Sequence, residues 1–95
     1  FTMTWGPAID NISNTERVAR CRCLRALLHV LAGPAGRDAS AALMAAERDP
    51  AAALAAVTAV EALPTLTRRR VLSTYSAVHG GPQTLPPWWR CLPAP

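Results

Sequence analysis

The sequence predicts a small all-α domain, a bundle of four to five helices followed by a proline-rich tail. The chain has 95 residues, which is enough for one domain and too few for two of ordinary size. Alanine is its commonest residue, and alanine favours helix. Aromatic residues make up only 5% of the chain, so strand-forming runs are scarce. Together these observations predict helices packed around a small core.

The N-terminal part of the chain predicts an extended arm followed by a long helix. Residues 1–12 show no helical period and are expected to form the arm. Ser13, with Glu16 three residues later, matches a capping box and predicts a helix over about residues 14–32. The apolar residues of this helix recur at helical spacing and predict one buried stripe, made of Val18, Cys21, Leu24, Leu28 and Leu31.

Two shorter helices are expected next, after the helix-ending stretch GPAG at residues 33–36. The first should run from residue 38 or 39 to residue 48, with Leu43 and Met44 as its large apolar side chains. Asp49 followed by Pro50 is a strong start signal for the second, expected over about residues 50–62. Its inward side chains are expected to be Leu54, Val57 and Val60.

A fourth helix is expected to begin at Thr65 or Thr67, either of which can cap it, and to end before the glycines at 80–81. The helical domain therefore spans residues 13–80, and a tail rich in proline and tryptophan spans residues 81–95. Two roles are open for Trp88 and Trp89 in this tail. They cover the small core, which is the favoured interpretation, or they stack on bases.

The charge of the chain favours an anionic partner. The net charge is +4, and all ten basic residues are arginines, whose planar guanidinium groups bind phosphate well. Nucleic acid and an anionic membrane surface both fit this charge. No apolar stretch reaches the 18 residues of a membrane span, and the N-terminus does not resemble a signal peptide. Three cysteines without a framework spacing predict reduced thiols, so a cytoplasmic protein is expected.

Two arginine clusters are candidate contacts with DNA. Arg68, Arg69 and Arg70 stand where the fourth helix starts, a position at which the helix dipole disfavours cations. A bound phosphate would explain them, because the free amides and threonine hydroxyls would face the same anion. The alternative is a solvated charge run. The second cluster lies on the first helix and comprises Arg17, Arg20, Arg22 and Arg25. It forms either a basic arm along a phosphate backbone or an ordinary exposed face.

Enzyme chemistry finds little support in the sequence. His29 lies among leucines and is interpreted as a packed core histidine, whereas His79 is expected to cap a helix C-terminus. The spacing of the cysteines and histidines matches no zinc pattern, and no phosphate-binding loop or nucleophile motif is present. We therefore expect no catalytic residue, no metal site, no cofactor and no small-molecule substrate.

The stretch LMAAERDPAAALAAVTAVEALPTLTRRRVLSTYSAV, residues 43–78, resembles the actinobacterial integration host factor family. The matching features are the Ala-Glu-Arg-Asp junction at 46–49, the Glu-Ala-Leu-Pro helix ending at 61–64, and the basic-to-apolar helix that follows. The resemblance implies a nucleoid-associated DNA-binding protein with a helix-two-turn-helix in its C-terminal half, over residues 50–79. It also implies that the turn and the start of its second helix contact the DNA backbone through Thr65, Thr67 and Arg68–Arg70.

The chain departs from the family pattern in two places. The family's turn usually carries a glycine and a lysine after the proline, where this chain has Thr65, Leu66 and Thr67. A basic C-terminal segment is replaced here by the Pro/Trp-rich tail. The expected function is binding of double-stranded DNA through phosphates, with weak sequence preference and some bending. The alternative is a non-enzymatic protein-interaction module that uses the Ala-rich helices and the tail.

Overall fold

The computed structural model describes residues 5–9 and 12–78 of the chain. Their backbone is almost entirely helical and contains no strand, which confirms the predicted all-α class. None of the helices in these ranges is long and apolar enough to cross a membrane. In chain order the elements are η1 (Gly6–Ala8), α1 (Asn14–Leu31), η2 (Gly33–Gly36), α2 (Arg37–Arg48), η3 (Pro50–Ala52), α3 (Ala53–Glu61) and α4 (Thr65–Val78), where η denotes a short 3-10 helix.

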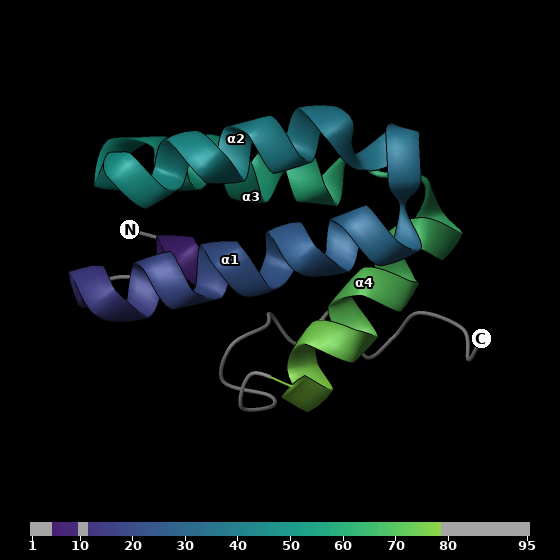
Figure 1. Cartoon of the computed structure of the whole chain (residues 1–95), viewed down its shortest axis with the longest axis horizontal. Coiled ribbons are helices and arrows are strands. Elements are labelled where there is room, and N and C mark those ends of the chain that lie inside the picture. Colours follow the sequence, from purple (N-terminus) through teal and green to yellow (C-terminus); the bar gives the residue numbers. More distant parts are fainter. Residues whose placement is uncertain (1–4, 10–11, 79–95) are drawn as a thin grey trace.

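The long helix α1 lies at the centre of the arrangement (Figure 1). It packs extensively against α2, which runs back along it, and α2 in turn packs against α3. On its other side α1 contacts α4, so that α4 docks mainly on α1 and much less on α3, its predecessor in the chain. The start of α4 therefore lies near the end of α1, at the opposite end of the molecule from the start of α1 (Figure 1).

The predicted helix start signals form as expected. The Ser13 hydroxyl accepts a hydrogen bond from the Glu16 backbone N–H at 3.1 Å, which confirms Ser13 as the N-cap of α1. The Asp49 carboxylate accepts one from the Ala51 N–H at 3.0 Å, and Pro50 follows it at the first helical position. The fourth helix begins at Thr65, the earlier of its two expected starts, but Thr65 is its first helical residue, so Pro64 and not a threonine precedes the helix.

The buried stripe of each helix differs from the predicted one in a few positions. Cys21, Leu24 and Leu28 of α1 are buried as predicted, but Val18 is only half-buried and Arg17 takes the position in line with them. On α3 the prediction for Leu54 is wrong, since this side chain is 58% exposed.

The physical reason for the error at Leu54 is the spacing of the alanines. The buried positions of α3 are Ala53, Ala56, Val57 and Val60, which follow the i, i+3, i+4, i+7 pattern of one helix face. Leu54 lies one residue, or about 100°, around the helix from Ala53. Alanines take these buried positions because their small side chains let two helices approach closely. Met44 of α2 is likewise exposed beside the buried Leu43.

The N-terminal segment is not an extended arm where it is described. Residues 6–8 form η1, and Trp5 just before it is buried in the core. The Trp5 indole Nε1 donates a hydrogen bond to the Glu61 carboxylate at 2.9 Å, and its ring meets Tyr75 edge-on with centroids 6.3 Å apart. The segment therefore joins α3 and α4 through the core, which a sequence without helical periodicity does not reveal.

Several predictions fall outside the described residues. They concern the glycines and proline expected to end α4, the tail with Trp88 and Trp89, and the role of His79. Within the described part, α3 and α4 are joined by the short connection 62–64.

Candidate nucleic-acid interface

The start of α4 presents part of the predicted phosphate site to solvent. Thr65 and Arg70 are exposed, while Thr67 and Arg69 are half-buried. The first backbone hydrogen bond of this helix runs from the Arg68 N–H to the Pro64 carbonyl at 2.8 Å. The amides of residues 65–67 therefore precede the helical hydrogen-bond ladder and point out of the helix start. Neither Arg69 nor Arg70 forms an ion pair with a carboxylate among the described residues.

Arg68 differs from its two neighbours because it reaches back to the preceding helix. Its Nη1 donates a hydrogen bond to the Glu61 backbone carbonyl at 3.0 Å. Glu61 is the last residue of α3, and the last carbonyls of a helix lack intrahelical partners and carry partial negative charge. Arg68 thus caps α3, and this contact offsets part of the cost of placing a cation at the start of α4.

Arg17, predicted as a DNA contact, lies inside the molecule instead, and this corrects the prediction. It is 5% exposed, and its Nε donates to the Ala46 carbonyl at 2.9 Å while its Nη2 donates to the Glu47 carbonyl at 3.3 Å. These carbonyls belong to the last turn of α2. The guanidinium group therefore caps the C-terminus of α2, where a cation is favoured by the helix dipole.

Arg20 is also engaged within the protein. Its Nε pairs with the Glu16 carboxylate at 3.0 Å, one helical turn earlier, and its Nη1 donates to the Gly6 carbonyl at 3.1 Å. This side chain ties η1 to α1. It is mostly buried, so it contributes little open positive charge.

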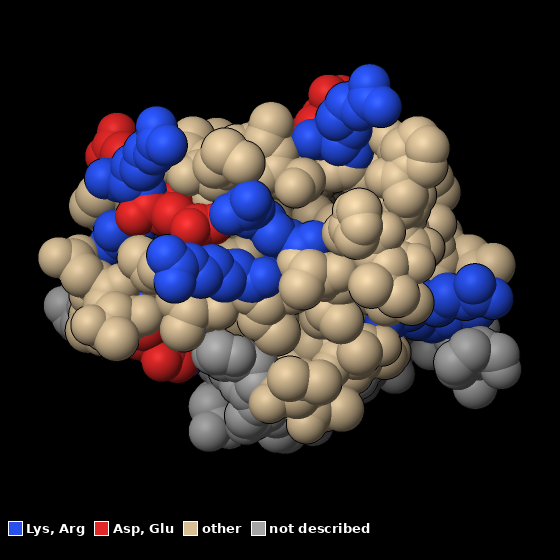
Figure 2. Space-filling model, viewed as in Figure 1, with Lys and Arg blue, Asp and Glu red and all other residues tan. Residues whose placement is uncertain are grey.

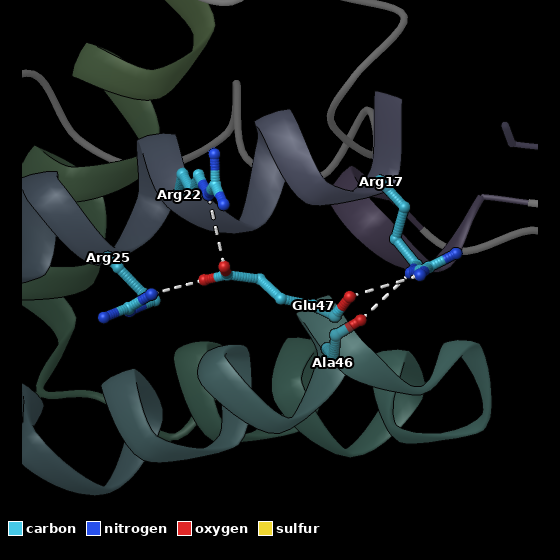
Figure 3. Close-up of polar contacts among 5 residues, drawn as sticks. All are labelled: Arg17, Arg22, Arg25, Ala46 and Glu47. Carbon is cyan, nitrogen blue, oxygen red and sulfur yellow. Dashed lines mark hydrogen bonds and ion pairs between the residues drawn. The ribbon is translucent and has the colours of Figure 1, made fainter. Parts of the chain in front are cut away.

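Arg22 and Arg25 converge on one carboxylate, that of Glu47 on α2 (Figure 3). Arg22 Nε lies 3.3 Å from Glu47 Oε1, and Arg25 Nη1 contacts Oε2. Burial acts to raise the pKa of the Glu47 carboxyl, but the hydrogen bonds and charges of Arg25 and Arg22 outweigh burial and lower it. Glu47 is therefore ionised, and two guanidinium groups share a single negative charge.

A shallow groove of about 530 Å³ lies beside this ion-pair cluster, between α1 and α2. Its lining residues are Arg22, Arg25, Ala26, His29 and Ser40. Figure 2 shows basic and acidic side chains interleaved over α1 and α2, and a further group of basic side chains near the end of the molecule where α4 begins. His29 is exposed at this groove, so its interpretation as a core histidine is wrong.

Cys21 and Cys23 of α1 form no disulfide within the described part of the chain. Cys21 is fully buried, and burial raises its pKa to about 11, with a smaller contribution from the Glu47 carboxylate. Burial also raises the pKa of Cys23. Such thiols are poor nucleophiles. In the described part of the chain no three histidine, cysteine or acidic side chains gather in a group that could hold a metal ion.

The ion pairs of Glu47 and the position of Ser40 and His29 at the groove were not predicted from the sequence. The signal that could have found them is the hairpin of α1 and α2, pinned by the turn at residues 33–36. In this antiparallel pair Glu47 lies opposite Arg22, and Ser40 lines the same groove as His29. Assigning that register in advance would have placed a carboxylate between two of the arginines.

Comparisons with protein-family models, with curated proteins and with solved structures find no match to this chain. The functional assignment therefore depends on the geometry and charge described above.

Proposed function

We propose that this chain is a non-enzymatic protein that binds double-stranded DNA through the phosphate backbone, with weak sequence preference. The observation that carries the proposal is the pair Arg69 and Arg70 at the start of α4, which has no carboxylate partner among the described residues. Exposed Thr65 and the outward-pointing amides of the first turn lie at the same helix end.

The energetic argument concerns the cost of this arrangement in the free protein. Cations at a helix N-terminus are disfavoured by roughly 0.3–1 kcal/mol each at the surface. Arg68 offsets part of its own electrostatic cost by capping α3, but Arg69 and Arg70 have no comparable contact among the described residues. A phosphate group at this end would be held by the amides, a threonine hydroxyl and the two guanidinium groups together.

The resemblance of residues 43–78 to the actinobacterial integration host factor family supports the same site. On this proposal α3, the connection 62–64 and α4 serve as the helix-two-turn-helix, and the protein is nucleoid-associated and bends the DNA it binds. Among the candidate contacts, the first contact surface comprises Thr65, Thr67, Arg69 and Arg70. Arg22 and Arg25 add positive charge on the α1–α2 face, whereas Arg17, Arg20 and Arg68 serve mainly to stabilise the fold.

The test is the salt dependence of binding to random-sequence duplexes, followed by fluorescence anisotropy. The double variant Arg69→Gln/Arg70→Gln should bind more weakly than the wild type and flatten the slope of log K against log salt by about 1.8, since each phosphate contact contributes about 0.9. The matched control is Arg37→Gln/Arg48→Gln, which removes two exposed arginines from α2. Equal losses in both variants, or a wild-type chain that does not bind duplex DNA, would contradict the proposal.

A second candidate function is a protein-interaction module, and one observation favours it. Large apolar side chains are exposed on each of the four α-helices, among them Val30 on α1, Met44 on α2, Leu54 on α3 and Leu66 on α4. Light scattering at physiological salt separates the two functions. A DNA-binding protein gains mass on addition of duplex, whereas an interaction module ignores the duplex.

A further inference from the structure

We propose that the groove between α1 and α2 is a second phosphate site for the DNA strand, distinct from the start of α4. In this site Arg22, Arg25, His29 and Ser40 surround one phosphodiester group, and Glu47 positions the two arginines. The inference rests on the proposed function and names a specific place where the strand is held.

The placement of the residues comes from the register of the helix pair. Arg22, Arg25, Ala26 and His29 lie on one face of α1, at i, i+3, i+4 and i+7, and Ser40 faces the same groove from α2. The rise from Arg22 to His29 is roughly 10 Å, a span that long arginine side chains cover from both ends. Ala26 in the middle leaves room for an anion because its side chain is a single methyl group.

The donors that face the groove are only partly used within the protein. Arg22 is 72% exposed and contacts Glu47 through Nε, so no hydrogen bond within the described part of the chain engages its terminal nitrogens. The Ser40 hydroxyl and the His29 ring likewise have no hydrogen bond among the described residues.

The charge balance determines what this groove accepts. Two guanidinium groups against one carboxylate leave one net positive charge beside the groove. Glu47 is only 12% exposed, and each of its two carboxylate oxygens contacts one arginine, so it holds both guanidinium groups beside the groove. A singly charged phosphodiester matches this net charge. A carboxylate in the lining would repel the phosphodiester, but Glu47 is not among the residues that line the groove.

The experiment measures the affinity of the full-length chain for a fluorescent random-sequence duplex at 0.1 M salt. A steric change with no charge comes first: Ala26→Leu fills the groove, and its matched control Ala55→Leu makes the same change on an exposed position of α3. We expect Ala26→Leu to weaken binding several-fold and Ala55→Leu to leave it unchanged. General electrostatic attraction alone would leave both unchanged.

Two charge changes test the role of Glu47. Arg22→Gln should weaken binding by about eightfold at 0.1 M salt, if affinities converge near 1 M salt. Glu47→Gln should also weaken binding, because the two guanidinium groups lose the carboxylate that holds them. The control Arg48→Gln should change binding less than Arg22→Gln. If Glu47 acted only as a negative charge that repels the phosphate, Glu47→Gln would strengthen binding instead. Circular dichroism melting checks that each variant folds. If Glu47→Gln is unfolded, the affinities of Ala26→Leu and Arg22→Gln test the groove site.

The outcomes separate this inference from the proposed function. If the wild-type chain binds duplex but Ala26→Leu and Arg22→Gln behave like their controls, the groove site is wrong and DNA binding stands. If the wild-type chain does not bind duplex, both are overturned. Binding of polyglutamate that depends on Arg22 and Ala26, without binding of duplex, would also overturn the assignment to DNA.

Discussion

Among individual residues, Arg17 has a purely internal role, because its guanidinium group satisfies two carbonyls at the end of α2. Replacing it with methionine keeps the apolar stem and removes the cap. We expect Arg17→Met to lower the free energy of unfolding by about 2–3 kcal/mol, since hydrogen bonds to charged groups are stronger than neutral ones and both carbonyls would be left unpaired. Urea denaturation followed by circular dichroism measures this loss.

The matched control for Arg17 is Arg48→Met, which removes an exposed arginine from the same end of α2. Surface substitutions of this kind change stability by less than about 0.5 kcal/mol. Equal unfolding midpoints for the two variants would show that Arg17 does not cap α2.

The buried thiol of Cys21 makes stability depend on alkaline pH. Burial raises the pKa of Cys21 to about 11, whereas an unfolded thiol has a pKa of about 8.5. The folded state therefore keeps a proton that the unfolded state releases, so its stability is fully present below pH 8.5 and falls as pH rises towards 11. At pH 11 the free energy of unfolding is lower by about 3 kcal/mol than it is below pH 8.5.

Cys21→Ala tests this dependence, because it removes the titrating group from a fully buried position. Its stability at pH 8 should be lower than that of the wild type, owing to the lost packing, but its decline between pH 8.5 and 11 should be shallower. Burial also raises the pKa of Cys23 and of Tyr75, so part of the decline remains in the variant. Parallel curves of urea midpoint against pH would contradict the assignment to Cys21.

At the scale of the elements, the α1–α2 hairpin depends on the close approach of Gly36 to α1. A Cβ atom at Gly36 would lie 2.9 Å from the Ala32 Cβ and 3.3 Å from the Leu28 Cβ. Gly36→Ala should therefore destabilise the protein by about 1–3 kcal/mol, as overpacking usually does. Thermal unfolding measures this change.

Gly33 in the same turn offers a control with a different physical basis. Its φ of +57° lies in the left-handed region, but nothing within 4 Å would meet an added Cβ. Gly33→Asn should cost less than Gly36→Ala, because asparagine adopts this conformation more readily than other non-glycine residues. A Gly36→Ala variant at least as stable as the wild type would show that α1 and α2 can separate freely.

The segment around η1 connects the helices through Trp5. Its side chain is 3% exposed, packs edge-on against Tyr75 and donates to Glu61. Trp5→Ala should lower the free energy of unfolding by about 3–5 kcal/mol, the usual cost of removing a buried aromatic side chain. Leu54→Ala is the control, because that large apolar side chain is exposed. Differential scanning calorimetry compares them, and similar losses would mean that Trp5 is not part of the core.

At the scale of the whole molecule, the local signals in the sequence predicted the helices, whereas long-range contacts set the details. Ser13 and Asp49 could be identified because each caps a helix through a neighbour two or three residues away. Arg17 could not, since the carbonyls it caps lie about thirty positions along the chain. Trp5 and Glu61 are further apart still.

The same distinction applies to the candidate site. The positions of Arg69 and Arg70 at a helix start were predictable from Pro64 and the threonines after it. The engagement of Arg68 with α3 was not, because it depends on how α4 leaves the preceding helix. The sharing of Glu47 by Arg22 and Arg25 depends on the register of α1 against α2, which follows from the turn at residues 33–36 and not from the pattern of either helix alone.

The dimensions of the molecule predict the length of DNA that it occupies. Its longest dimension is 32 Å, and duplex DNA rises about 3.4 Å per base pair, so one chain should cover about nine base pairs. A 10-base-pair duplex should bind one chain and a 20-base-pair duplex two, which stoichiometric titration at low salt and sedimentation velocity both measure. One chain that saturates 20 base pairs would instead require DNA contacts beyond the described helices or a duplex bent around them. A longer occupied length would therefore support the proposed bending or contacts from the tail, whereas a length of nine or ten base pairs fits a straight duplex that lies along the described helices.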